Sequence, residues 1–331
     1  MKKLLAILLM LAMVISLVAC SSKETKKEDV PETGGGVQLE ETKAPEEKEK
    51  YTIGIIYAVI HPFFQGTTEG AQDKAKELGN VDLIVKAPEV SDASKQIQIM
   101  EDMISMGVDA IAIGAVDAAA LKPVIDEATA KGIKVVTFDS DSPESSRLGY
   151  IGTDNVKAGR HMGEVLGEQL GGKGKVLVSM GAATQMNLIE RIDGVKEVLA
   201  EKYPDIEILD EQSSQADTNI ALSNIENMVT AHPDFDALIG IDAVAGPAAV
   251  VVWKARGLDQ KVITFDDTDD IIQGVRDGQI TVTIAQNQYL WGTTIVEELV
   301  AACQGKEIPE FFDAGTREID ASNVAEFYPE A

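Results

Sequence analysis

The sequence predicts an α/β protein built from two doubly wound lobes. Short apolar runs of strand length alternate with amphipathic segments of helix length across residues 51–331, a pattern typical of parallel sheets with helices on both faces. An internal sequence repeat indicates that the two lobes are similar. Residues 134–139 (KVVTFD) return as 261–266 (KVITFD), and 109–111 (DAI) return as 236–238 (DAL), both displaced by 127 residues without a gap.

The first half of this region alternates regularly between the two patterns. A strand is expected at 51–58, followed by a helix at 62–79 that closes on a glycine. Ser91 marks the expected start of the next helix, and Lys131 with Gly132 the stop of the third. The other expected elements are strands at 81–85, 109–114 and 134–138, and helices at 91–106 and 118–131.

The second half repeats the alternation. Apolar runs predict strands at 175–178, 206–209, 237–241, 261–265 and 280–284. Amphipathic spacing predicts helices at 156–170, 188–202, 218–231, 247–256 and 271–277. In sheets of this kind ligands bind outside the carboxyl ends of the strands, so polar residues that follow the strands are the first candidates for a site.

Composition and charge exclude several classes of protein. The 331 residues include 29 Lys+Arg and 55 Asp+Glu, a formal net charge of −26, and 45% are hydrophobic. This is too apolar for a disordered chain and too acidic for an unaided nucleic-acid binder, and the length suggests two folded units. Only Cys20 and Cys303 are present, which gives neither a disulfide framework nor a CxxC pair.

The first 50 residues predict an export signal and a tether. Two lysines precede an apolar run at 4–19, shorter than the roughly 20 residues of a membrane-spanning helix. The run ends in LVAC at 17–20, which resembles the lipobox of bacterial lipoproteins, so we expect a signal peptide at 1–19 and a lipid-modified Cys20. An ordinary signal peptide is the alternative. Six Lys, nine Asp+Glu and no aromatic residue follow at 21–50, a composition typical of a solvated tether.

Polar and aromatic residues cluster where the predicted strands end. Carboxylates and amides accept several hydroxyl hydrogen bonds, and aromatic rings cover the apolar faces of sugars. The sequence therefore predicts a cleft that binds a sugar or polyol. For each aspartate, capping of the next helix is an equal alternative, and for the phenylalanines core packing is. These candidates are Asp139, Asp141, Asp242, Asp266, Gln286, Phe63 and Phe64.

Signatures of catalytic or metal sites are incomplete. Residues 167–173 nearly match a phosphate loop, but Gly174 stands where Ser or Thr is required, and the stretch follows a helix. The acidic run at 266–270 lacks the glycine and the distal glutamate of an EF-hand calcium loop. The three histidines, His61, His161 and His232, have no metal-ligand spacing. We therefore expect no enzyme activity and no cofactor, and we assign no residue to a metal site.

Several motifs follow one another along the chain: HPFF at 61–64, FD at 138–139, IGTDN at 151–155, Asn187 with Glu190 and Arg191, FD at 265–266 and TIAQ at 283–286. Taken in this order, they resemble the ribose-type sugar-binding proteins of ABC importers, also called type I periplasmic binding proteins. The resemblance implies two Rossmann-like lobes joined by a three-strand hinge, with crossings near Thr153, Asn287 and 313–316. The lobes would be 51–153 plus 288–314, and 154–287 plus 315–331.

The resemblance also implies roles for particular side chains. Phe63 and Phe64 would stack on or edge the sugar ring. Asp139 and Asp266 would accept hydroxyl protons, and Arg191 would donate to sugar oxygens. The full expected set of ligand contacts is His61, Phe63, Phe64, Asp139, Asp141, Asn187, Arg191, Asp242, Phe265, Asp266 and Gln286, the last at a crossover.

Four positions depart from the ribose pattern. His61 and Ile241 stand where asparagines are common, Ser140 replaces an arginine, and Ala216 replaces an aromatic residue. These changes remove hydrogen-bond donors and a stacking face, so ribose itself is not supported as the ligand. The Asp139-Ser140-Asp141 stretch is more similar to relatives that take rhamnose, other hexoses, inositol or autoinducer-2.

The resemblance implies a monomeric receptor that is lipid-anchored at the outer face of the cytoplasmic membrane, or periplasmic, and passes a sugar or polyol to an ABC permease and its ATPase. A sensory co-receptor, which binds a sugar-like signal such as autoinducer-2 for a kinase or chemoreceptor, would use the same cleft and is the alternative. A transcriptional regulator with this lobe pair is disfavoured, because the predicted lipoprotein signal and tether occupy the place of a DNA-binding head.

Overall fold

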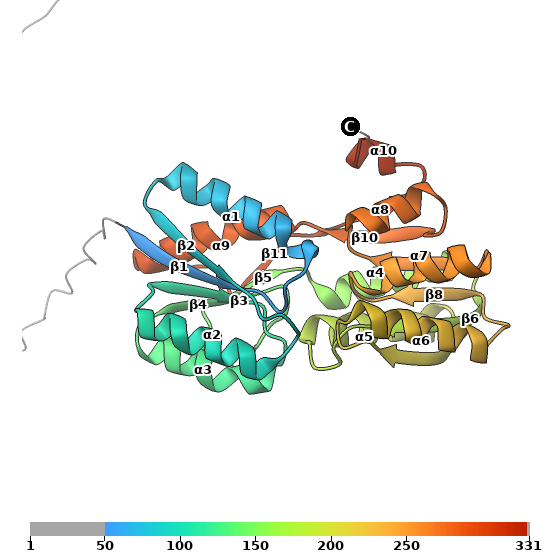
Figure 1. Cartoon of the computed structure of the whole chain (residues 1–331), viewed down its shortest axis with the longest axis horizontal. Coiled ribbons are helices and arrows are strands. Elements are labelled where there is room, and N and C mark those ends of the chain that lie inside the picture. Colours follow the sequence, from blue (N-terminus) through green and yellow to red (C-terminus); the bar gives the residue numbers. More distant parts are fainter. Residues whose placement is uncertain (1–49, 330–331) are drawn as a thin grey trace, which may run out of the picture. The chain divides into compact units, whose positions relative to one another are not determined.

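The computed structural model describes residues 50–329. The predicted signal peptide, Cys20 and nearly all of the predicted tether lie outside the described residues. The described part forms two α/β lobes, each built on one sheet with helices on both faces (Figure 1). This confirms the predicted fold class. No helix between residues 50 and 329 is long and apolar enough to cross a bilayer.

The first lobe has an all-parallel sheet. Its strands are β1 (Tyr51–Ile56), β2 (Val81–Lys86), β3 (Ala110–Ile113), β4 (Lys134–Phe138), β5 (Tyr150–Gly152) and β11 (Phe311–Asp313). They lie in the order β11-β5-β4-β3-β1-β2. The helical elements are the 3-10 turn η1 (Pro62–Phe64) and the helices α1 (Gln65–Leu78), α2 (Ala93–Met106), α3 (Ala118–Ala130) and α9 (Gln288–Cys303).

The second lobe repeats this plan with one antiparallel edge strand. Its strands are β6 (Lys173–Met180), β7 (Asp205–Ser213), β8 (Ala237–Gly240), β9 (Lys261–Phe265), β10 (Val282–Gln286) and β12 (Thr316–Asp320). They lie in the order β12-β10-β9-β8-β6-β7. The helices are α4 (Asn155–Gln169), α5 (Met186–Lys202), α6 (Thr218–Ala231), α7 (Ala245–Arg256), α8 (Asp269–Arg276) and α10 (Val324–Phe327).

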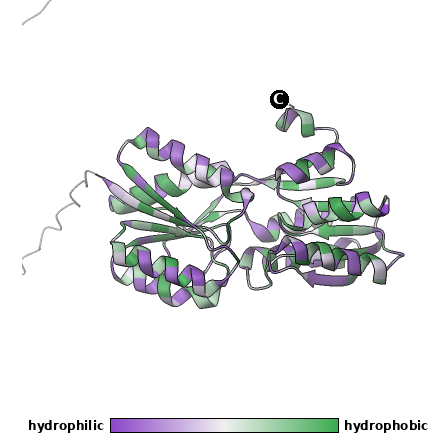
Figure 2. Cartoon of the chain, in the orientation of Figure 1, coloured by the Kyte–Doolittle hydropathy of each residue, from purple (hydrophilic) through white to green (hydrophobic). Residues whose placement is uncertain are grey.

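The two copies of the internal sequence repeat form equivalent strands in the two lobes. β4 lies between β3 and β5, and β9 lies between β8 and β10, so the 127-residue repeat relates the same position in the two sheets. Both β3 and β8 are buried along their whole length, as expected of strands covered on two faces. The middle of each sheet is accordingly hydrophobic, and the helices carry their polar residues outward (Figure 2).

The chain passes between the lobes three times: after β5, after β10, and between β11 and β12. Asp313 links the first and third of these passages. Its Oδ1 accepts from the backbone amide of Asp154 at 3.3 Å and from that of Gly315 at 2.9 Å. The three-segment connection implied by the resemblance is therefore present.

Several predicted boundaries are wrong by a few residues for local reasons. The second helix begins after Asp92 rather than Ser91, because the Asp92 carboxylate accepts from the amides of Ser94 and Lys95. The last predicted strand starts at Val282 rather than Ile280, because the turn that closes α8 continues through Ile280, whose amide donates to the Gly274 carbonyl. The short strands β5, β11 and β12 were not predicted.

Candidate ligand-binding site

A cavity of about 60 Å³ lies between the carboxyl ends of the strands of the two lobes. The first lobe contributes Ala58, Val59, His61, Phe63, Phe64 and Asp139. The second lobe contributes Gln185, Asn187, Leu188, Arg191, Ala216, Asp242, Ala243, Val244, Asp266 and Gln286. This is the edge at which doubly wound sheets bind their ligands. Its volume is sufficient for a few water molecules, which indicates that the lobes are closely apposed.

Direct hydrogen bonds between the lobes explain the small volume. The Asn187 side-chain amide donates to Asp139 Oδ1 at 3.1 Å, across the cavity. Beside the cavity, the Thr184 hydroxyl donates to the Val116 carbonyl at 2.9 Å. Because two facing side chains of the cavity bond to each other, a ligand that enters must replace the bond between Asn187 and Asp139 with its own.

Nine of the eleven predicted contact residues line this cavity. They are His61, Phe63, Phe64, Asp139, Asn187, Arg191, Asp242, Asp266 and Gln286. The other two, Asp141 and Phe265, do not line it.

Asp141 is held by a neighbouring arginine. Arg147 donates through Nε to Asp141 Oδ1 at 2.5 Å and through Nη2 to Oδ2 at 2.6 Å, a bidentate ion pair in which both side chains are largely buried. The Thr137 hydroxyl and the Ser142 amide donate to the same carboxylate. Asp141 therefore fixes the loop between β4 and β5, a role that the sequence spacing did not reveal.

The buried ring of Phe265 packs against the guanidinium of Arg191. Its ring is fully buried in β9, and the guanidinium carbon of Arg191 lies 3.9 Å from the ring centroid. A cation over an aromatic face is attracted by the ring quadrupole. Phe265 therefore contacts Arg191 rather than the space a ligand would occupy.

Arg191 is the central donor of the cavity and is only 1% exposed. It donates to Asn155 Oδ1 at 3.0 Å, to the Ile241 carbonyl at 3.2 Å and to Gln286 Oε1 at 2.9 Å. The packing of α4 on α5 fixes its backbone, because a Cβ atom at Gly159 would lie 2.1 Å from the Arg191 carbonyl oxygen. A buried guanidinium needs such partners to offset its lost hydration.

Three acids surround this one guanidinium. Burial raises the pKa of Asp139 and of Asp242 to about 6, and the pKa of Asp266 to about 8, while the charge of Arg191 acts in the opposite direction on all three. Burial therefore favours the protonated form of Asp266, in which the carboxyl group can donate as well as accept. The cavity thus offers both donors and acceptors, which matches the two-way hydrogen bonding of hydroxyl groups.

One of the three aspartates bonds to backbone amides at the start of a helix, although the N-cap residue of that helix is Val244. Asp242 Oδ1 accepts from the amides of Val244 at 3.3 Å and Ala245 at 3.1 Å, at the start of α7. Asp139 is followed by β5 rather than a helix. Asp266 Oδ1 instead accepts from the Gln286 side chain at 2.7 Å, and the residue that precedes α8 is Thr268.

The two phenylalanines combine cavity lining with core packing. Phe64 is 4% exposed and stacks on Tyr57, with ring centroids 4.5 Å apart and planes 10° apart. Phe63 is half-buried and meets the Trp291 ring edge to face, at 5.8 Å between centroids. His61 begins this segment, where its Nδ1 accepts from the Phe63 amide at 3.2 Å. Burial lowers the pKa of His61, so the imidazole is neutral at pH 7.

The lining residues that the sequence did not single out are mostly small or apolar. They are Ala58, Val59, Gln185, Leu188, Ala243 and Val244. Each lies within a few residues of a predicted contact, and that proximity was the only signal available. Gln185 is the one polar addition, buried at the residue preceding α5.

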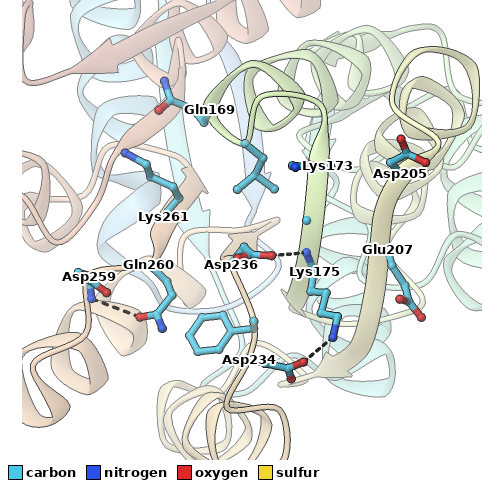
Figure 3. Close-up of a pocket in the computed structure, with 13 residues that line it drawn as sticks. Gln169, Lys173, Lys175, Asp205, Glu207, Asp234, Asp236, Asp259, Gln260 and Lys261 are labelled. Carbon is cyan, nitrogen blue, oxygen red and sulfur yellow. Dashed lines mark hydrogen bonds and ion pairs between the residues drawn. The ribbon is translucent and has the colours of Figure 1, made fainter.

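A larger depression, of about 830 Å³, opens at the opposite ends of the strands in the second lobe (Figure 3). Some of its charged groups bond to one another: Lys175 pairs with Asp234, and the Lys175 backbone amide donates to Asp236 at 2.8 Å. Size alone therefore does not identify the site; buried acids with raised pKa values do. Within residues 50–329, no group of three or more His, Cys, Asp or Glu residues could hold a metal ion.

Comparison with known proteins identifies a family and several relatives of this chain. Residues 54–307 match the family described as periplasmic binding protein domain. The chain is 29% identical over 268 residues to the ribose import binding protein RbsB of Bacillus subtilis. The match covers 81% of this chain and 86% of RbsB. It is 30% identical over 270 residues to the D-ribose/D-allose-binding protein of Pseudomonas aeruginosa. That match covers 77% of this chain and 84% of the Pseudomonas protein.

A solved structure is similar over nearly the same span. The ABC transporter solute-binding protein from Burkholderia graminis, in complex with D-arabinose, has a TM-score of 0.81 and 36% identity, over 84% of this chain and 98% of that one. The fold and the matches together define a periplasmic solute-binding protein of the type I class. The chain belongs to the periplasmic binding protein family, in its ribose-type branch, whose members are binding proteins and not enzymes.

Proposed function

We propose that this protein captures a monosaccharide or a related polyol between its two lobes and delivers it to an ABC permease and its ATPase. The observation that carries the proposal is the buried cavity in which Asp139 of one lobe faces Arg191 and Asp266 of the other. The names of the relatives support it, since they include ribose and allose binders and a D-arabinose complex.

Capture would work through contacts divided between the lobes. Acids accept hydroxyl protons, Arg191 donates to ring or hydroxyl oxygens, and Phe63 offers a ring face for the apolar side of a sugar. Only a closed arrangement satisfies both sets of contacts at once. The ligand therefore favours closure by its differential affinity for the two states, and the three connecting segments act as the hinge.

The N-terminal residues complete the proposal. A lipid on Cys20 would hold a monomeric receptor at the outer face of the cytoplasmic membrane, and a tether over 21–50, as the composition predicts, would span on the order of 30 Å. That reach lets the lobes approach a permease in many orientations. The acidic body, by contrast, has no charge attraction to an anionic lipid surface.

A thermal-shift screen of the full chain tests the proposed function. The panel contains D-ribose, D-arabinose, D-allose, L-rhamnose, myo-inositol and autoinducer-2, and the Asp266→Ala variant is the matched control. A true ligand at 100 times its dissociation constant stabilises the native state by about 2.7 kcal/mol, so we expect a clear rise in Tm for at least one sugar or polyol, and none in the variant. A rise with autoinducer-2 alone would favour the sensory co-receptor. No rise with any compound at millimolar concentration would contradict sugar capture.

A further inference from the structure

The aspartates that face each other in the cavity have an unusual backbone conformation. Among the described residues, the non-glycine residues with positive φ are Asp139 at 59°, Gln215 at 54°, Ala216 at 60° and Asp266 at 74°. Three of these four line the cavity. A residue other than glycine is strained in this region, and the conformation persists only where the surroundings hold it.

The neighbouring strand β10 holds the backbone of Asp266 at both of its polar groups. The Asp266 amide donates to the Ile284 carbonyl at 2.8 Å. The Asp266 carbonyl accepts from the Thr283 hydroxyl at 2.5 Å. Thr283 is fully buried and does not line the cavity. Its hydroxyl therefore acts on the cavity only through the main chain of Asp266.

The first lobe holds Asp139 in the same way, with a different residue. The Asp139 amide donates to the Ile151 carbonyl at 3.2 Å, and its carbonyl accepts from the Tyr150 hydroxyl at 2.8 Å. The Ser140 amide donates to the Phe138 carbonyl at 2.6 Å, which makes Asp139 the centre of a three-residue γ-turn with positive φ, a strained type. In both lobes, a hydroxyl from the adjacent parallel strand donates to the carbonyl of the aspartate.

We propose that Thr283 and Tyr150 are positioning residues for ligand binding, each of which keeps an aspartate in the left-handed conformation that places its carboxyl group in the cavity. This inference rests on the proposed function of that cavity. Without the hydroxyl, the buried carbonyl of the aspartate loses its partner, and the backbone of the aspartate loses one of its two bonds to the neighbouring strand. The Asp266 carboxyl group is then no longer held in the position at which the Gln286 side chain donates to it.

The second lobe contains a matched control. Thr264 lies on β9, pairs directly with Thr283 of β10 and is equally buried. Its hydroxyl has no hydrogen-bond partner among the described residues. Thr283→Val and Thr264→Val therefore make the same chemical change in the same layer of the lobe, and only the first removes a bond to Asp266. Tyr150 is less suitable for this comparison, because its hydroxyl also interacts with Thr153 and Asn155.

The experiment measures the affinity of the full chain for D-arabinose and D-ribose by calorimetric titration. We expect Thr283→Val to weaken binding about three- to tenfold, in line with the loss of one buried hydrogen bond. Thr283→Ser keeps the hydroxyl and should bind like the parent, as should Thr264→Val. A purely structural role of Thr283 would lower the melting temperature without this loss of affinity. Equal affinity of Thr283→Val and the parent, or an equal loss in Thr264→Val, would overturn the proposal.

A second measurement needs no sugar. The titration midpoint of the Asp266 carboxyl group, followed by carbon NMR, should move in Thr283→Val and stay in place in Thr283→Ser and Thr264→Val. An unmoved midpoint in Thr283→Val would refute the positioning role even if neither sugar binds. Absence of binding by the parent would instead count against the proposed function for these two sugars, so the two failures are distinguishable.

Discussion

Replacing Arg191 by alanine is expected to weaken sugar binding at least a hundredfold. Arg191 is the one guanidinium among three buried acids, and its bonds to Asn155 and Gln286 also order the cavity. Hydrogen bonds to charged groups contribute about 1.5–3 kcal/mol each, and a ligand would receive more than one from this side chain. Calorimetric titration with the best sugar of the panel measures the loss.

Two further variants make this result interpretable. Arg160→Ala removes an arginine of α4 that makes ion pairs with Glu197 and Glu201 on the surface, and it should bind like the parent. Arg191→Lys keeps the buried charge but loses the planar fork of donors, so the variant should fold and still bind at least tenfold more weakly. A folded Arg191→Lys variant with parental affinity would contradict the assignment of Arg191 to the ligand.

The free energy of unfolding is expected to fall as the pH rises from about 6.5 to 8. Burial raises the pKa of Asp266 from 3.8 to about 8, so in this range the native state retains a proton that the unfolded state has lost. Stability then decreases with pH, by up to about 1.4 kcal/mol per pH unit. The raised pKa values of Asp139 and Asp242 also make stability fall with rising pH, but only below about pH 6. The lowered pKa of His61 has the opposite effect: below pH 6.5 it makes stability rise with pH.

Denaturant titrations at several pH values check this dependence. The Asp266→Asn variant should lose the slope between pH 6.5 and 8, because asparagine has no proton to release. Asp270→Asn, which changes an exposed acid in the first turn of α8, should keep it. Identical slopes in the parent and Asp266→Asn would show that Asp266 ionises in the native cavity as freely as in water.

The fold was predictable because its strands are buried on two faces. Strands β4 and β9 coincide with the predicted bounds at 134–138 and 261–265, since continuous apolar runs between polar ends leave little choice of register. Strands β5 and β11 have three residues each, too few for any periodicity. Strand β12 carries exposed polar residues along an antiparallel edge, so it lacks the apolar run that marks the others.

The candidate site was predictable where a side chain follows a strand, and not where tertiary contacts redirect it. Asp139 and Asp266 line the cavity as the strand ends suggested. Asp141 follows the same strand, but Arg147 draws its carboxylate into an ion pair, and no pattern in the sequence distinguishes the two acids. The hydroxyl support from Thr283 was equally hidden, because it depends on the register between β9 and β10.

The most direct test of sugar capture is a crystal structure of the protein grown with the best sugar of the panel. We expect one sugar between the lobes, with hydroxyl oxygens within hydrogen-bond distance of Asp139, Asp266 and Arg191, and with the bond between Asn187 and Asp139 replaced by contacts to the ligand. A sugar bound elsewhere, such as in the depression beside Lys175, or a cavity left without sugar at a saturating concentration, would contradict it.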